Sequence, residues 1–204
     1  MMKKYLLVVA CAFVAALMVV VIWFQEYLPF KAQVFIASYI IVPAHLQSLP
    51  ADRKITVQNW QSFEQWTEAS ALCHKTFWFE SVQTPHFLRK IKSLGVNVDT
   101  HPQELPDAKW EIKHHVGVLG MSVSQIQYWG DSGSEFFVRV NSPPDVVIKS
   151  LGAGALPKYF PELNYLAVVL TEKPTLNNPF PNLIFVRGAQ DNQHSYIGCR
   201  EFDY

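Results

Sequence analysis

The sequence predicts an α+β fold, in which an N-terminal single transmembrane helix is followed by one compact domain with a mainly antiparallel sheet and two or three helices. Three observations support this prediction: an uncharged apolar run near the start, short segments in which apolar and polar residues alternate, and turn sequences that join such segments as hairpins. Hairpin connections favour an antiparallel sheet over the doubly wound parallel folds that βαβ units build.

The composition is that of a folded protein without a charge bias. Half of the 204 residues are hydrophobic and 14% are aromatic, which provides the apolar surface for a core. Lys plus Arg equals Asp plus Glu at 17 each, so no net field attracts nucleic acid, and we expect no nucleic-acid partner. We divide the chain into a cytoplasmic start with a transmembrane anchor (1–24), a juxtamembrane segment and linker (25–53) and an extracytoplasmic domain (54–204).

The apolar run from Tyr5 to Phe24 has the length and composition of a membrane-spanning helix. It carries no charge, and about 20 helical residues cross the hydrocarbon core of a bilayer. Lys3 and Lys4 precede the run and Glu26 is the first charge after it, an asymmetry that keeps the N-terminus in the cytoplasm. We expect a single-pass protein of a bacterial inner membrane, with the lipid bilayer as one partner and the domain in the periplasm.

Two alternatives to this topology remain. A cleaved signal peptide also begins with lysines and an apolar run, and Val9-Ala10-Cys11 is similar to part of a lipobox, although apolar sequence continues well beyond Cys11. A second apolar stretch, Ala32 to Ala44, is too short to span a bilayer by itself, and we expect it to lie against the membrane or the domain. If it crossed back, the domain would stand in the cytoplasm.

Three segments of the domain are predicted to be helical. Thr84 and Pro85 suit an N-cap and a first helical position. Ser62 followed by Gln65 has the spacing of a capping box. The predicted helices run from about Ser62 to Leu72, between Thr84 and Gly95, and from about Ser142 to Gly152.

The remaining domain segments are predicted to be strands. From Lys109 onward apolar residues alternate, and the phase changes near Gly117 and Gly120, which indicates a bulge or a turn. The other predicted strands are Thr76 to Val82, Met121 to Trp129, Ser134 to Val140, Tyr165 to Thr171, Leu183 to Arg187 and Ser195 to Phe202.

The segment Gly130-Asp131-Ser132-Gly133 resembles the sequence around the nucleophilic serine of chymotrypsin-like proteases. That resemblance implies a catalytic role for Ser132. Four residues match, but Ser134 stands where that family has a further glycine, and no segment resembles the family's Ala-Ala-His-Cys motif. Glycine and aspartate also suit a tight turn, and we interpret the segment as the turn of a hairpin.

Histidines and carboxylates do not occur at the spacing of a metal or catalytic site. Adjacent residues of a strand point to opposite faces, so His114 and His115 cannot easily bind one ion together. We expect His114 to be a satisfied core or sheet residue. Glu64, Glu68 and Glu80 are expected to be solvated, with nothing to bring two of them together. We therefore predict no catalytic residue, no metal ligand and no cofactor.

Cys73 and Cys199 are the cysteines beyond the anchor, and they form a possible disulfide. An oxidising compartment permits such a bond, and it would tie the N-terminal helical part to the last strand. The alternative is a pair of buried free thiols. The sequence does not give the distance between them.

These patterns favour a non-enzymatic role. We expect a membrane-anchored domain that binds another envelope protein as an accessory or assembly factor. An inhibitor or immunity-type envelope protein is one alternative. Another is an anchored envelope hydrolase, for which Ser132 or Ser122 would be the nucleophile and the base would be one of four histidines, His74, His114, His115 or His194.

A reporter fusion tests the predicted topology. Alkaline phosphatase is active only after export, so a fusion after Tyr204 should be active in intact cells. An inactive fusion would show that the chain crosses the membrane a second time.

Overall fold

The computed structural model describes residues 28–40, 55–74, 84–100, 108–131, 133–161 and 163–202. The predicted anchor from Tyr5 to Phe24, the predicted strand from Thr76 to Val82 and Ser132 lie outside these ranges. Within them, no helix combines the length and the apolar character needed to span a bilayer.

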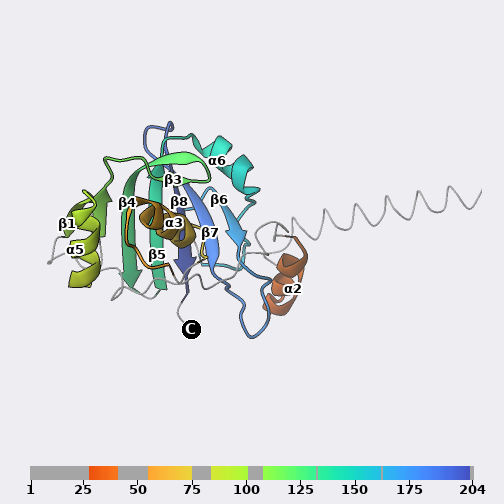
Figure 1. The fold of residues 1–204 in the computed structure, drawn as a ribbon. Coiled ribbons are helices and arrows are strands. Elements are labelled where there is room, and N and C mark those ends of the chain that lie inside the picture. Colours follow the sequence, from red (N-terminus) through yellow and green to blue (C-terminus); the bar gives the residue numbers. More distant parts are fainter. Residues whose placement is uncertain are drawn as a thin grey trace, which may run out of the picture.

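In the described part of the chain, eight strands form one sheet (Figure 1). Their order is β1-β2-β4-β5-β8-β7-β6, the short β3 pairs with β4, and every pairing is antiparallel. This confirms the predicted α+β fold with a mainly antiparallel sheet. The strands are β1 (Asn97–Thr100), β2 (Ala108–Glu111), β3 (Gly117–Val118), β4 (Met121–Asp131), β5 (Gly133–Val140), β6 (Ala167–Leu170), β7 (Leu183–Gly188) and β8 (Ser195–Glu201).

The helices of the domain begin and end close to the predicted signals. The Thr84 hydroxyl accepts a hydrogen bond from the N–H of Phe87 at 3.4 Å, and Gly95 has a φ of 86° just after the helix. Gly152 ends the last helix in the left-handed region. The described helices are α2 (Phe30–Ile40), α3 (Trp60–Ala71), α5 (Pro85–Ser93) and α6 (Pro144–Leu151).

The start of α3 differs from the prediction. Asn59, not Ser62, is the N-cap, and its side chain accepts a hydrogen bond from the N–H of Ser62 at 2.9 Å. The Ser62 hydroxyl in turn accepts one from the N–H of Asn59, also at 2.9 Å. Ser62 is therefore the N3 residue of the capping box. The helix begins two residues earlier than predicted, because asparagine caps a helix as well as serine does.

The main core lies between the sheet and α3, which crosses one face of it (Figure 1). Trp66 of α3 stacks on Trp110 of β2 with ring centroids 6.1 Å apart, and it meets Phe136 of β5 edge-on at 5.3 Å. Each of these three side chains is at most 3% exposed. Aromatic burial of this extent holds α3 in place on the sheet.

Two carboxylates of α3 hold the β3–β4 hairpin. Oε1 of Glu64 accepts a hydrogen bond from the N–H of Gly117 at 2.7 Å, and Oε1 of Glu68 accepts one from the N–H of Leu119 at 3.0 Å. Leu119 and Gly120 both have positive φ, as a tight two-residue turn requires. The expectation that these glutamates are solvated and not brought together was therefore wrong. They lie one helical turn apart and reach the same hairpin.

The opposite face of the sheet carries a second apolar cluster. Helix α2 packs at its margin, since the ring of Phe30 lies 5.7 Å from Tyr159 and 6.2 Å from Phe180, and Val34 is 2% exposed. The start of α2 thus contacts the domain, and Val34, which belongs to the predicted apolar stretch from Ala32 to Ala44, is buried. The buried members of the cluster are Phe137, Phe160, Val168, Leu170, Leu183 and Phe185.

Gly198 leaves room for two aromatic rings that pack over the centre of one face of the sheet. It stands in β8 directly between Phe137 of β5 and Phe185 of β7. A Cβ atom at this position would lie 2.5 Å from Cβ of Phe137, 2.6 Å from the carbonyl oxygen of Phe136 and 2.6 Å from Cζ of Phe185. The bare backbone is therefore a steric requirement of this packing.

Replacing Gly198 by alanine tests this requirement. We expect Gly198→Ala to lower the free energy of unfolding by about 1–3 kcal/mol, because overpacking forces the strands or rings apart. Urea denaturation of the purified chain measures the change. Gly154→Ala is the matched control, since a Cβ there meets nothing within 4 Å. Equal stability of both variants and the parent chain would contradict the expectation.

Candidate functional site

A buried carboxylate, Glu135 of β5, is the centre of a charged cluster on the second face of the sheet. The residue is 6% exposed. Its Oε1 accepts hydrogen bonds from Nη1 of Arg200 at 2.7 Å and from the hydroxyl of Tyr165, and its Oε2 accepts one from Nη2 of Arg187 at 3.2 Å. Arg200 is its direct partner in the β5–β8 register. Three donors therefore hold one carboxylate in a desolvated position.

Arg187 reaches Glu135 from β7 across a platform of aromatic rings. Its guanidinium carbon lies 5.5 Å from the ring centroid of Phe137, 5.4 Å from that of Tyr165 and 5.2 Å from that of Phe185. Tyr165 stacks on Phe185 with centroids 4.3 Å apart. The negative faces of the rings attract the cation and restrict its side chain.

Arg200 and Trp129 complete a pocket beside this platform. The guanidinium carbon of Arg200 lies 5.6 Å from the ring centroid of Trp129. The cavity has a volume of about 340 Å³. We call it the arginine pocket, and its lining residues are Trp129, Glu135, Phe137, Arg187 and Arg200.

The lining residues of the arginine pocket carry an excess of one positive charge, with two guanidinium groups against one carboxylate. The Nε atoms of Arg187 and Arg200 are buried, and neither has a hydrogen-bond partner within the described structure. Each guanidinium has five N–H donors, so the pocket retains donors that Glu135 does not use.

Tyr165 acts in this cluster as a neutral donor. Burial raises the pKa of its phenol, and the nearby negative charge of Glu135 raises it further. The hydroxyl therefore keeps its proton and donates it in the hydrogen bond to Glu135. With its ring on Phe185, Tyr165 helps to cover the carboxylate.

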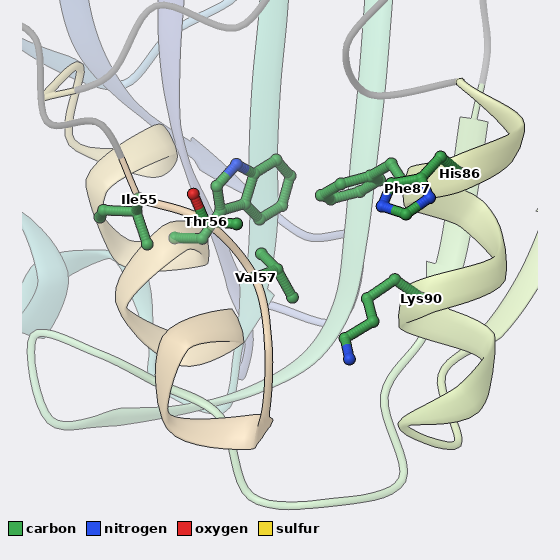
Figure 2. A pocket seen from close by; sticks show the side chains of 7 residues that line it. Ile55, Thr56, Val57, His86, Phe87 and Lys90 are labelled. Carbon is green, nitrogen blue, oxygen red and sulfur yellow. The ribbon is translucent and has the colours of Figure 1, made fainter.

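A second cavity lies on the helical side of the sheet. Figure 2 shows His86, Phe87 and Lys90 of α5 projecting toward Thr56 and Val57. The cavity has a volume of about 230 Å³ and is lined by Ile55, Thr56, Val57, Trp66, His86, Phe87 and Lys90. Its polar groups make no convergent set, so the arginine pocket is the stronger candidate site.

The structure separates the candidate hydrolase residues that it describes. Ser122 lies in β4 opposite Gly117, and no hydrogen bond joins it to a histidine of the described ranges. His194 instead lies in the turn before β8, where Nδ1 is 2.8 Å from Oδ2 of Asp191. Ser132 itself is outside the described residues. The strands beside it form the predicted hairpin, with Asp131 opposite Gly133.

The other histidines do not form a site either. His114 was expected to be a core or sheet residue, but it is exposed in the loop after β2, where its ring lies 4.8 Å from that of Trp60. Strand β2 ends at Glu111, before His114, and this explains the error. His115 is also exposed, and His74 is buried after α3. Among the described residues, no group of three His, Cys, Asp or Glu side chains could hold a metal ion.

Asp191 organises the turn between β7 and β8. Its Oδ1 accepts hydrogen bonds from the N–H groups of Gln193 and His194 at 3.1 Å each, and its Oδ2 lies 2.8 Å from Nη2 of Arg139. Desolvation acts to raise the pKa of Asp191, but the hydrogen bonds from Gln193 and His194 outweigh it and lower the pKa below its ordinary value. The contacts explain a turn, and they do not form a ligand site.

Cys73 and Cys199 form a disulfide in the structure, with Cα atoms 5.0 Å apart. This separation lies within the range that the bond requires. Cys73 follows α3, and Cys199 lies in β8 on the main-core face, next to Arg200 in sequence. The bond therefore ties α3 to the strand that also carries the arginine pocket.

No protein-family model, no curated protein and no solved structure matches this chain. The residues of the candidate site must be judged on their own geometry.

Sequence reasoning did not find the arginine pocket. Glu135, Arg187 and Arg200 stand in strands that consist largely of buried residues. A charge inside such a strand is a signal for a buried pair. These three residues become partners through the register of β5, β8 and β7, and because the side chain of Arg187 extends over the aromatic rings. The spacing of residues in the sequence reveals neither feature.

The disulfide can be tested directly. We expect the intact chain to migrate differently with and without reductant and to gain the mass of two hydrogens on reduction. A bond that joins residues 126 apart should add about 3–5 kcal/mol to the free energy of unfolding in the chain-entropy model, so Cys73→Ser should lose about that amount. Cys11→Ser is the matched control, since Cys11 is not part of the pair. Unchanged mobility and mass would show two free thiols.

Proposed function

We propose that this chain is a single-pass inner-membrane protein whose periplasmic domain binds another envelope protein through the second face of its sheet. The observation that carries the proposal is the arginine pocket, an open site with charged and aromatic walls. We expect the partner to cover Trp129 and the neighbouring polar side chains of β4 and β2, which include Gln127 and Lys109.

The chemistry of the pocket suits binding better than catalysis. Trp, Tyr and Arg are the residue types that contribute most at protein interfaces. Glu135 is 6% exposed and accepts hydrogen bonds from two guanidinium groups and a phenol, which suits a role in holding the arginines better than proton transfer to a substrate. The other lining residues are tryptophan, phenylalanine and arginine, none of which supplies a nucleophile.

The position of α2 supports an envelope partner. Phe30, its first residue, is six positions after Phe24, the end of the predicted anchor, and it packs against Tyr159 and Phe180 of the domain. Such a short connection would hold the domain close to the bilayer. Partners within reach would then be membrane proteins or proteins at the membrane surface.

Site-specific photo-crosslinking tests this proposal. Lys109 is exposed on the second face of the sheet, so a photoreactive amino acid at this position should give one discrete crosslinked product in intact cells. Mass spectrometry should identify an envelope protein, and that protein, once purified, should bind the detergent-solubilised chain in a fixed ratio.

Lys92 of α5 is the matched control position, because it is exposed on the helical side. It should give no such product. A product from Lys92 alone, or no product from either position, would contradict binding through the second face.

A further inference from the structure

We infer that the arginine pocket receives a carboxylate group of the partner polypeptide, and this inference rests on the proposed protein-binding function. The carboxylate belongs either to an acidic side chain or to the end of the partner's chain. It would lie beside Arg187 and Arg200 and against the ring of Trp129, which line the pocket.

The first argument is the balance of charge. Glu135 neutralises one of the two guanidinium groups, so the lining residues retain one positive charge. Both cations are largely withdrawn from water, because the side chain of Arg200 is 12% exposed and that of Arg187 is 30% exposed. A single incoming negative charge balances the site.

The second argument is the number of available donors. The hydrogen bonds to Glu135 use one N–H group of each guanidinium. Both Nε atoms are buried and do not face the opening, so the donors left for a ligand are the unused Nη N–H groups. A guanidinium presents its donors as a planar fork that matches the two oxygens of a carboxylate.

The third argument is the rigidity and shape of the walls. Rings on either side fix the guanidinium groups, since Arg200 lies over Trp129 and Phe202 and Arg187 lies over Phe137. A volume of about 340 Å³ admits one side chain or one chain end. The balanced net charge of the protein makes a polyanion an unsuitable occupant, and a lone carboxylate on an apolar stem fits these walls.

Nuclear magnetic resonance of the full-length chain in lipid nanodiscs tests the inference without a known partner. The readout is the Nε–H resonances of Arg187 and Arg200. The probes are N-acetylglutamate α-amide, which has only a side-chain carboxylate, N-acetylalanine, which has only a chain-end carboxylate, and N-acetylglutamine α-amide, which is neutral. Inorganic phosphate is the fourth probe.

We expect both resonances to shift and saturate with a carboxylate probe and to remain unchanged with the neutral amide. The carboxylate that saturates at the lower concentration identifies the source, either a side chain or a chain end. Shifts that match those of the neutral amide, or that increase without saturation, would overturn the inference. So would tighter saturation by inorganic phosphate than by either carboxylate.

A pair of variants strengthens the test. Arg187→Lys keeps a positive charge for Glu135 but loses the planar fork, so it should weaken carboxylate binding by about tenfold or more. Lys92→Gln removes an exposed cation from the helical side of the sheet, away from the pocket, and it should leave binding unchanged. Backbone spectra show whether each variant is folded. Equal affinity of a folded Arg187→Lys chain and the parent chain would overturn the inference.

The titration and the crosslinking experiment fail independently. A crosslinked partner without carboxylate binding would overturn the inference and leave the proposed function standing. Saturable carboxylate binding without any crosslinked protein would overturn the protein-binding function, and with it the assignment of the carboxylate to a polypeptide.

Discussion

The close approach of Phe137 and Phe185 over the bare backbone of Gly198 is the constraint on which the second face of the sheet depends. The two rings, 6.0 Å apart between centroids, form the platform that supports Arg187. Arg187 then reaches Glu135, and Glu135 in turn orients Arg200. The positions of the charged groups in the arginine pocket thus depend on the absence of a side chain at Gly198.

The ion cluster imposes a second condition on the fold. A carboxylate that has left water is stable only if its hydrogen bonds are complete, and removal of one partner from a buried ion pair costs about 3–5 kcal/mol. Glu135 meets this condition with two cations and a phenol. These hydrogen bonds restrain the side chains of the pocket, and a pre-organised site loses less entropy on binding than a flexible one. Stability and recognition here depend on the same contacts.

Local signals predicted much of the fold. Thr84, Pro85 and Gly95 define α5 because caps and glycine act within a few residues, and alternation with turn residues located β4, β5, β7 and β8. Competing local signals led to the wrong cap at Ser62, since Asn59 stands three residues before it.

Features that depend on distant partners could not be predicted. The sequence indicates that Glu64 and Glu68 face solvent, but in the structure both accept hydrogen bonds from the β3–β4 hairpin that packs against α3. His114 follows the apolar alternation, but the strand has already ended. Glu135 and Arg200 lie 65 residues apart, and only the strand register makes them neighbours. Side-chain chemistry between strands is set by register, which a single sequence does not contain.

The strand order also governs when the sheet can form. β8 follows the other described strands in the sequence, yet it lies between β5 and β7 near the middle of the sheet. A nascent chain therefore leaves the edges of β5 and β7 without a neighbour until residues 195–201 have emerged. Until then the β1–β5 half and the β6–β7 hairpin have no hydrogen-bonded connection through the sheet. The two parts of the sheet can therefore join only after β8 is available, and such pairing between strands far apart in the sequence slows folding.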